Sequence, residues 1–244
     1  MDKVVIYFSP TAGTKSVAEL IAGRIDARAV DITVFTLAMD LQKDDLVFFC
    51  FPVYGGRIPS PIYERMNHIH GNETPIIPVA VFGNRAVDDA LLEMSDLAEK
   101  NGFITVGGAE IIAPHSLNSK VAAGRPDASD KTKIFEYLDK LVAKDSFEKV
   151  TLPGNRPYVE YKGVPVYPAP NKKECIGCGI CFNNCPAGAI NEAQMKTDKS
   201  KCISCMRCVY LCSTDSRSVP LPMRLAAEAT AKKMGAVRKE PKFY

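Results

Sequence analysis

The chain has 244 residues, of which 46% are hydrophobic, and this length accommodates two domains with packed cores. No apolar run is long enough to cross a bilayer, because the densest, residues 46–51, has only the length of a strand. Residues 1–150 carry 16 Lys and Arg against 21 Asp and Glu, whereas residues 151–244 carry 15 against 7. The first half is therefore acidic and the second half basic, and such opposite charges favour docking of one half on the other. A solvated basic C-terminal tail would also explain the excess of Lys and Arg in the second half.

Residues 1–148 alternate between apolar runs and amphipathic segments, which is typical of an α/β domain. The predicted strands are residues 3–8, 29–36, 46–51, 76–82 and 103–112. The predicted helices are residues 15–28, 87–101 and 129–144, the last with Asp127 or Ser129 as its N-cap, and residues 58–69 are predicted to carry a short helix behind proline. Because the strands alternate little, we expect a doubly wound, five-stranded parallel sheet with helices on both faces and ligands at the carboxyl ends of the strands.

The first predicted strand leads into a loop of hydroxyl side chains and a glycine, which opens the first helix. Free backbone N–H groups, short hydroxyl donors and a helix N-terminus are what a terminal phosphate needs. The loop has neither the P-loop ending nor the glycine pattern of a dinucleotide turn. Residues 5–14 resemble the flavodoxin signature, which implies that the phosphate of FMN is held by Ser9, Thr11, Ala12, Gly13 and Thr14.

Two further strand ends extend this resemblance to flavodoxin-like proteins, in which the corresponding loops embrace the isoalloxazine ring. The residues that the resemblance assigns to the ring are Pro52, Val53, Tyr54, Gly55, Gly83, Asn84 and Arg85. Glycines let the backbone approach the ring edge, and an aromatic side chain can stack on its face. His115, at another strand end, is a further candidate for contact with flavin or substrate. The chain has no tryptophan to cover the flavin, which implies a more open ring face than in ordinary flavodoxins.

A proline-rich linker follows, and it places the boundary of the first domain near residue 150. Its prolines are Pro153, Pro157, Pro165, Pro168 and Pro170. Proline at this density excludes helix and favours an extended backbone. The interleaved tyrosines and valines indicate that residues 151–170 lie against a surface.

Eight of the nine cysteines form two nearly identical clauses with the spacing Cys-x2-Cys-x2-Cys-x3-Cys. This doubled spacing predicts two [4Fe–4S] clusters, and the last cysteine of each clause is expected to bind the other cluster. One cluster is then assigned to Cys175, Cys178, Cys181 and Cys212. The other is assigned to Cys202, Cys205, Cys208 and Cys185. Two alternatives are zinc sites and disulfides. Zinc would leave the third and fourth cysteines of each clause without a role. Disulfides suit small secreted domains, which this chain does not resemble.

Residues 171–215 resemble a bacterial-type two-[4Fe–4S] ferredoxin in their cysteine clauses and in residues 185–190 and 198–203. Ser213 follows Cys212 where that family often has proline, which implies a looser or more solvated turn beside the first cluster. The whole ordered set of motifs, with residues 114–116 and 123–127, resembles a family that fuses a flavodoxin-like FMN domain to such a ferredoxin. This resemblance covers nearly the whole chain.

The expected domains are therefore residues 1–150, the linker 151–170, a small α+β ferredoxin-like domain at 171–216 and a basic tail at 217–244. Residues 222–235 fit an amphipathic helix with Leu225, Ala229, Lys232 and Lys233 in register. We expect this helix to pack on the ferredoxin unit and not to bind nucleic acid, because aromatic interleaving is absent. No signal peptide is evident before the first strand, so we expect a cytoplasmic protein with no membrane partner, from an oxygen-poor setting.

The combination predicts an electron-transfer flavo-ferredoxin, in which two [4Fe–4S] clusters exchange electrons with one FMN and with redox partner proteins. No acid–base or nucleophilic constellation is needed for that task, and the catalytic residues of an enzyme are not evident. One alternative is an FMN-dependent reductase of a small organic or quinone-like substrate, with Tyr54, Arg85 and His115 around its pocket. Another alternative is a redox or iron sensor whose ferredoxin half controls docking to a partner.

Overall fold

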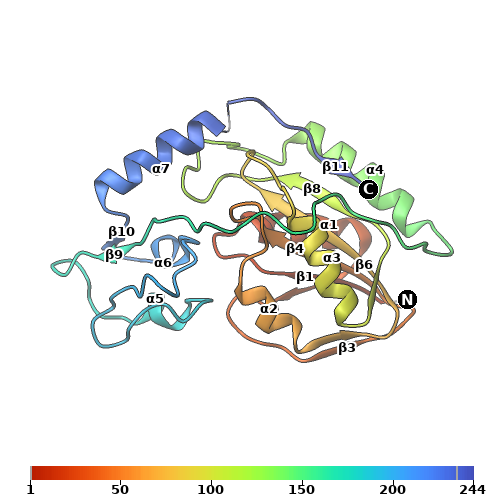
Figure 1. The fold of residues 1–244 in the computed structure, drawn as a ribbon, viewed down its shortest axis with the longest axis horizontal. Coiled ribbons are helices and arrows are strands. Elements are labelled where there is room, and N and C mark those ends of the chain that lie inside the picture. The colour runs from red at the N-terminus through yellow and green to blue at the C-terminus, as the bar shows by residue number, and fades with distance from the viewer. Residues whose placement is uncertain (1, 235) are drawn as a thin grey trace.

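The computed structural model describes residues 2–234 and 236–244, in which a large α/β unit lies beside a smaller irregular unit (Figure 1). The main sheet has five parallel strands: β1 (Lys3–Tyr7), β2 (Arg28–Asp31), β4 (Leu46–Pro52), β6 (Thr74–Phe82) and β8 (Ala109–Ile112). Their order across the sheet is β2-β1-β4-β6-β8, which is the flavodoxin-like order of a doubly wound fold. The predicted fold class is confirmed.

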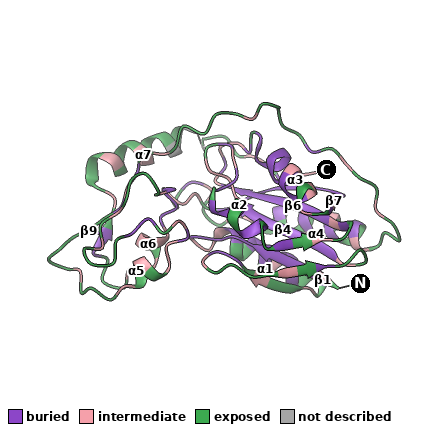
Figure 2. Ribbon diagram, turned by 60° about the horizontal axis from the view of Figure 1, so that its bottom comes forward, coloured by how far each residue is buried: buried purple, intermediate pink, exposed green. Residues whose placement is uncertain are grey.

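Helices cover both faces of this sheet. One face packs against α1 (Gly13–Ile25) and α4 (Ala128–Val142), and the other against α2 (Pro61–Met66) and α3 (Ala90–Lys100). Phe48 and Cys50 of β4 contribute to the first of these cores, whereas Val47 and Phe49 contribute to the second. Figure 2 shows the buried residues concentrated in this sheet and its helices. Burial on both faces explains why the strand sequences are apolar without alternation.

The predicted strand at residues 103–112 is wrong as one element, because the chain breaks it into β7 (Phe103–Thr105) and β8. Gly107 and Gly108 lie at the break, where a Cβ on Gly108 would stand 2.6 Å from the side chain of Leu152. The backbone of Gly108 instead exchanges two hydrogen bonds with Tyr244, at 3.2 and 2.9 Å. The C-terminal segment forms β11 (Lys242–Phe243), which pairs antiparallel with β8 and extends the main sheet.

Two other departures from expectation concern strands. Strand β2 ends at Asp31 because Asp31 Oδ1 accepts from the backbone N–H of Thr33, a local bond that replaces the strand ladder. The short helix expected behind proline within residues 58–69 is confirmed as α2, whose N-terminus is fixed by Pro61. The residues around it form an unpredicted pair of parallel strands, β3 (Met39–Leu41) and β5 (Ile69–Gly71).

The composition predicted an extended linker that lies against a surface, and in the structure its first half lies against α3. Leu152 is buried in the core of the large unit. Asp89, just before α3, accepts hydrogen bonds from the backbone N–H groups of Asn155 and Val159. Burial acts to raise the pKa of Asp89, but these two hydrogen bonds hold it below its ordinary value. The first half of the linker is therefore part of the larger unit's surface and not a free tether.

The smaller unit contains four short elements: β9 (Ala169–Pro170), α5 (Ile180–Asn183), α6 (Arg207–Tyr210) and β10 (Arg217–Ser218), with β9 and β10 paired antiparallel. Most of its residues are exposed or half-buried (Figure 2), so it has little hydrophobic core of its own. Domains this small commonly depend on metal or disulfides for stability. Among the described residues, no helix is long and apolar enough to span a membrane.

Residues 217–244, which were expected to form a basic tail, contribute to three different elements of the structure. Arg217 belongs to β10, the next residues form α7 (Leu221–Met234), and the last ones form β11 of the large unit. Helix α7 bridges the two units above their junction (Figure 1), and Asn118 of the large unit donates a hydrogen bond to the carbonyl of Glu228. The expected end of the helix, Gly235, lies outside the described residues. The chain thus leaves the large unit through the linker and returns to it through α7.

Replacing Leu152 by alanine tests whether the linker stabilises the large unit. We expect its free energy of unfolding to fall by about 2–4 kcal/mol, because the substitution removes a buried side chain and leaves a cavity. Urea unfolding followed by far-UV circular dichroism measures the change. Val159→Ala, at a linker position that is 42% exposed, is the matched control and should cost less than about 0.5 kcal/mol. Equal losses in the two variants would contradict the packing role of the linker.

Candidate functional site

A cavity of about 640 Å³ lies where the carboxyl ends of the main strands meet the smaller unit and α7. It is called the main cavity below, and its volume is in the range of about 300–1,000 Å³ found for cofactor sites. Ten of the twelve residues predicted to bind flavin line it: Ser9, Thr11, Gly13, Thr14, Pro52, Val53, Tyr54, Gly55, Gly83 and Arg85. Residues from distant parts of the sequence are thus brought to one edge of the sheet.

The other two predicted flavin residues, Ala12 and Asn84, do not line the main cavity. Ala12 is the N-cap of α1, with a left-handed backbone (φ 65°) that turns the chain into the helix. Asn84 is buried, and its amide binds the C-terminal segment by donating to the carbonyl of Val237 and accepting from the N–H of Lys239. The Asn84 side chain therefore holds the returning chain beside the cavity.

The loop of residues 9–14 is held rigidly at one end of the main cavity. The N–H of Ser9 donates to Thr33 Oγ1, and Ser9 Oγ accepts from the N–H of Lys15, both at 2.8 Å. No side chain of the N-cap residue caps α1, so N–H groups of its first turn remain available beside the hydroxyls of Thr11 and Thr14. The positive end of the helix dipole lies there as well. These groups fit the phosphate of a mononucleotide.

Tyr54 and the turn that follows it form another part of the wall of the main cavity. Gly55 has a positive φ of 59°, and a Cβ there would stand 3.0 Å from the ring of Tyr161, so glycine allows the linker to close over the turn. Burial raises the pKa of Tyr54 well above its ordinary value, and the neighbouring Cys205 and Tyr161 add to this shift. Tyr54 is thus near a cysteine of the smaller unit.

His115 packs against Gly83 on the third side of the main cavity. A Cβ on Gly83 would stand 2.5 Å from the imidazole, so this contact requires glycine. His115 Nδ1 accepts a hydrogen bond from the N–H of Leu117 at 3.1 Å. Burial lowers the pKa of His115, and the positive charge of Arg85 lowers it further. The imidazole is therefore neutral near pH 7 and serves as an acceptor within its own loop.

Three segments that line the main cavity were not predicted to do so: residues 163–166 of the linker, Ile203 with Ser204, and one side of α7. The lining side chains of α7 are Met223, Ala226, Ala227 and Thr230. Their i, i+3, i+4, i+7 spacing is visible in the sequence and defines one helix face. The register centred on Leu225 was wrong, because Leu225 is 55% exposed.

The eight cysteines of the two clauses gather into two sets, each around a small cavity of about 20 Å³. One set, called the distal set, is Cys175, Cys178, Cys181 and Cys212. The other, called the proximal set, is Cys185, Cys202, Cys205 and Cys208. This is the crosswise grouping predicted from the spacing. In the part of the chain that the structure describes, no three His, Cys, Asp or Glu side chains converge on the position of a single metal ion.

The backbone repeats the same unusual conformation in both cysteine loops. Gly177 and Gly179 in the first loop have positive φ angles, and so have the equivalent Ser204 and Met206 in the second. Left-handed residues at alternate positions curl each loop around its cavity. The N–H of Ala189 also donates to Cys185 Sγ at 3.3 Å. Loops of this shape fit a cluster held by several thiolates, whose sulfur atoms accept such N–H bonds.

The two sets differ in their surroundings. Cys205 of the proximal set is 8% exposed and belongs to the core of the large unit together with Ile203. Cys178 of the distal set is exposed, and its neighbour Ile176 is 69% exposed. The proximal set therefore adjoins the main cavity, whereas the distal set lies near the protein surface.

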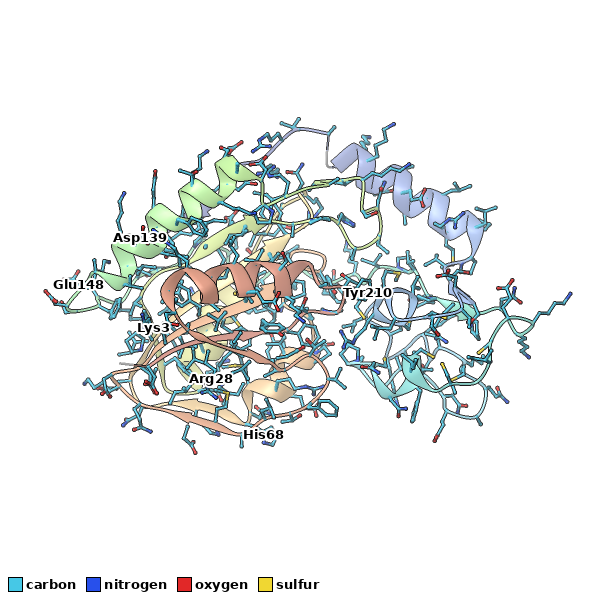
Figure 3. All side chains as sticks on the ribbon, turned by 180° about the vertical axis from the view of Figure 1, so that it is seen from behind. Lys3, Arg28, His68, Asp139, Glu148 and Tyr210 are labelled. Carbon is cyan, nitrogen blue, oxygen red and sulfur yellow. The ribbon has the colours of Figure 1, made fainter. Side chains whose placement is uncertain are left out.

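Two arginines, one buried in the large unit and one half-buried in the smaller unit, join the units in opposite directions. Arg207 of the smaller unit donates through Nη1 to the carbonyls of Ser9 and Pro10, both at 3.2 Å. Arg65 of the large unit donates through Nη2 to the carbonyl of Pro186 at 3.2 Å. Tyr210, at the side of the smaller unit that faces the large one (Figure 3), lines an adjoining cavity of about 380 Å³ with Thr11 and His115. The loop expected to bind phosphate is thus in direct contact with the proximal cysteine loop.

Comparison with known proteins supports the same division of the chain. Residues 168–213 match the model of the 4Fe-4S dicluster domain. No curated protein sequence gives a significant match. The chain therefore combines a domain of flavodoxin-like topology with a 4Fe–4S domain.

Solved structures similar to the chain include flavodoxin 2 from Bacillus cereus, at 14% identity and a TM-score of 0.44, with 58% of this chain and 98% of that chain covered. A putative flavoprotein from Bacteroides eggerthii DSM 20697 has 16% identity and a TM-score of 0.41, with 59% and 99% covered. An azoreductase from Bacillus anthracis str. Sterne has 12% identity and a TM-score of 0.37, with 58% and 98% covered.

Replacing both Arg65 and Arg207 by methionine should loosen the junction between the units. Hydrogen bonds from charged donors contribute about 1.5–3 kcal/mol each, so we expect the population of separated units to rise at least about tenfold. The rate of thermolysin cleavage between the units measures this opening. Arg156→Met is the control, because Arg156 is exposed and its hydrogen bonds go to Asp96 of the large unit alone. Cleavage of the double variant at the control's rate would show that the two arginines do not hold the units together.

Proposed function

We propose that this chain is an electron-transfer protein that passes electrons between two [4Fe–4S] clusters and one FMN. Iron–sulfur clusters exchange single electrons, whereas a flavin exchanges one or two and so can serve both kinds of partner. The observation that carries the proposal is the shared wall between the two cofactor sites. Ile203 and Ser204 line the main cavity while standing in sequence between Cys202 and Cys205 of the proximal set.

The residues of the main cavity fit FMN. Residues 9–14 offer one pocket for a terminal phosphate, and the chain has no glycine pattern of a dinucleotide turn. Tyr54 and Gly55 at one side and Gly83 with Arg85 at another leave an apolar slot for a planar ring. Met223 and Ala227 of α7 also line the main cavity. We expect this helix face to shield part of a bound ring in a chain that has no tryptophan.

The two cysteine sets fit two clusters with different tasks. The distal set, with Cys178 and Ile176 exposed, is open to redox partner proteins. The proximal set is shielded from solvent by the large unit, where the thiol of Cys205 is buried. We infer a route that enters at the distal set, continues to the proximal set and ends at the main cavity, or runs in reverse.

The reductase alternative is favoured by one observation, the adjoining cavity of about 380 Å³. It shares Thr11, His115 and Ala227 with the main cavity, and Arg224 lines it as well. A small substrate could enter by this space. Steady turnover of a small molecule by the reduced protein would favour the reductase, whereas a sensor would show no turnover and a partner affinity that changes with oxidation state.

Removing two hydroxyl donors tests the FMN site. Thr11→Ala combined with Thr14→Ala should weaken FMN binding at least about tenfold, because each hydrogen bond to a charged group contributes about 1.5–3 kcal/mol. Quenching of FMN fluorescence on titration with flavin-depleted protein gives the affinity. Thr36→Ala, at an exposed position of the same domain, is the control and should bind as the unaltered chain does. Extraction of FAD from the purified protein, or unchanged FMN affinity in the double variant, would refute the site.

Transfer between the units should be intramolecular. After rapid reduction of the clusters, the rate of flavin reduction in stopped-flow absorbance should not depend on protein concentration. Cutting the linker after Gly163 should leave this rate independent of concentration, because α7 and β11 still connect the smaller unit to the large one. A rate that scales with the concentration of the intact chain would mean that the clusters serve another molecule, and the proposed route would be wrong.

A further inference from the structure

Arg217 is the first residue of the segment 217–244 that was expected to form a basic tail. In the structure it is 2% exposed, and it is among the largest fully buried side chains of the described residues. It stands in β10 of a unit whose other side chains are mostly exposed or half-buried. A buried guanidinium in such a small unit requires a physical reason, because moving a charge out of water is costly unless an opposite charge compensates it.

The partners of Arg217 do not supply that opposite charge. Nη1 donates to the carbonyl of Met195 at 2.6 Å, and Nη2 donates to Thr197 Oγ1 and the carbonyl of Pro168. All three acceptors are neutral. Nε is buried without a hydrogen-bond partner, and no carboxylate in the described part of the chain forms an ion pair with the side chain.

The remaining contacts of Arg217 are with the two cysteine sets. Nη1 lies 3.8 Å from Sγ of Cys181, and the side chain lines the cavity of the distal set. Pro168 and Thr197, which bind Nη2, line the cavity of the proximal set. The guanidinium therefore stands between the two cavities with one nitrogen toward each.

We propose that Arg217 is the shared internal counter-ion of the two [4Fe–4S] clusters and raises the reduction potentials of both. The proposal rests on the proposed function only in taking both cysteine sets to hold clusters. A cluster with four thiolates is an anion, so two of them provide the negative charge that the neutral partners of Arg217 lack.

The effect on potential follows from charge balance. Reduction of a cluster adds one electron and therefore one negative charge, with no bond made or broken in the protein. A fixed cation beside the sulfurs stabilises the reduced form more than the oxidised form, and low local dielectric strengthens this effect. Arg217 touches a cysteine of the distal set directly and reaches the proximal set through Thr197 and Pro168, so the distal cluster should respond more strongly.

The test is a dithionite titration of the intact, cluster-loaded chain, followed by electron paramagnetic resonance of the reduced clusters. Dithionite supplies the electrons, one for each cluster. In Arg217→Met the equilibrium constant for reduction should fall by about tenfold or more at the distal cluster, the size expected for loss of one charge-assisted hydrogen bond. Arg217→Lys keeps the charge and should stay within about threefold of the unaltered chain. Lys201→Met removes an exposed charge from the same unit and should change little, because solvent screens it.

Unchanged midpoints in Arg217→Met with its full iron content, or an equal shift in Lys201→Met, would overturn the proposal while leaving the proposed function intact. Loss of iron in Arg217→Met but not in Arg217→Lys would support it, because charge alone then decides whether the clusters persist. Equal loss of iron in both variants would overturn it in favour of a packing role. An unaltered chain that carries fewer than two clusters' worth of iron would instead refute the proposed function itself.

Discussion

The contact between the loop of residues 9–14 in the large unit and the proximal cysteine loop of the smaller unit organises the rest of this molecule. Arg207 binds two carbonyls of the first loop, and Ile203 and Ser204 complete the wall of the main cavity. Because this wall separates the cavity from the proximal cysteines, whatever binds in the cavity is surrounded by protein from both units. The site is therefore a product of domain packing and not of the flavodoxin-like sheet alone.

Arginines support the smaller unit at several places. Arg65 and Arg217 are buried and Arg207 is half-buried, and each has a buried Nε atom without a hydrogen-bond partner in the described chain. Their remaining nitrogens bind mostly backbone carbonyls, although Nη1 of Arg65 also pairs with Glu64 at 3.0 Å. A unit with so little hydrophobic core is held by charge-assisted hydrogen bonds to neutral acceptors, and anionic clusters in the two cysteine sets would balance the buried positive charge.

Two connections keep the units together and limit how far the smaller unit can move from the main cavity. The linker lies along α3, fixed by Leu152 and by the hydrogen bonds of Asp89, and the chain then returns over the main cavity as α7 and closes the sheet as β11. Asn84 anchors the returning segment beside the cavity. With both ends of the smaller unit attached to the same domain, its effective concentration beside the cavity is high and its range of orientations is small.

The sequence by itself determined the α/β class, most of the loops that line the main cavity and the crosswise grouping of the cysteines, because apolar strand runs and thiolate spacing are visible in the order of residues. It did not determine the break at Gly107 and Gly108, the face of α7 that meets the cavity, or the burial of Arg217. Each of these depends on a partner far away in the sequence: Tyr244 pairs with Gly108, the junction of two units selects the α7 face that carries Met223, and two cysteine sets enclose Arg217. From its sequence alone, a short basic segment is predicted to be exposed to solvent. Whether its side chains are buried depends on residues distant in the sequence, so only the tertiary structure decides it.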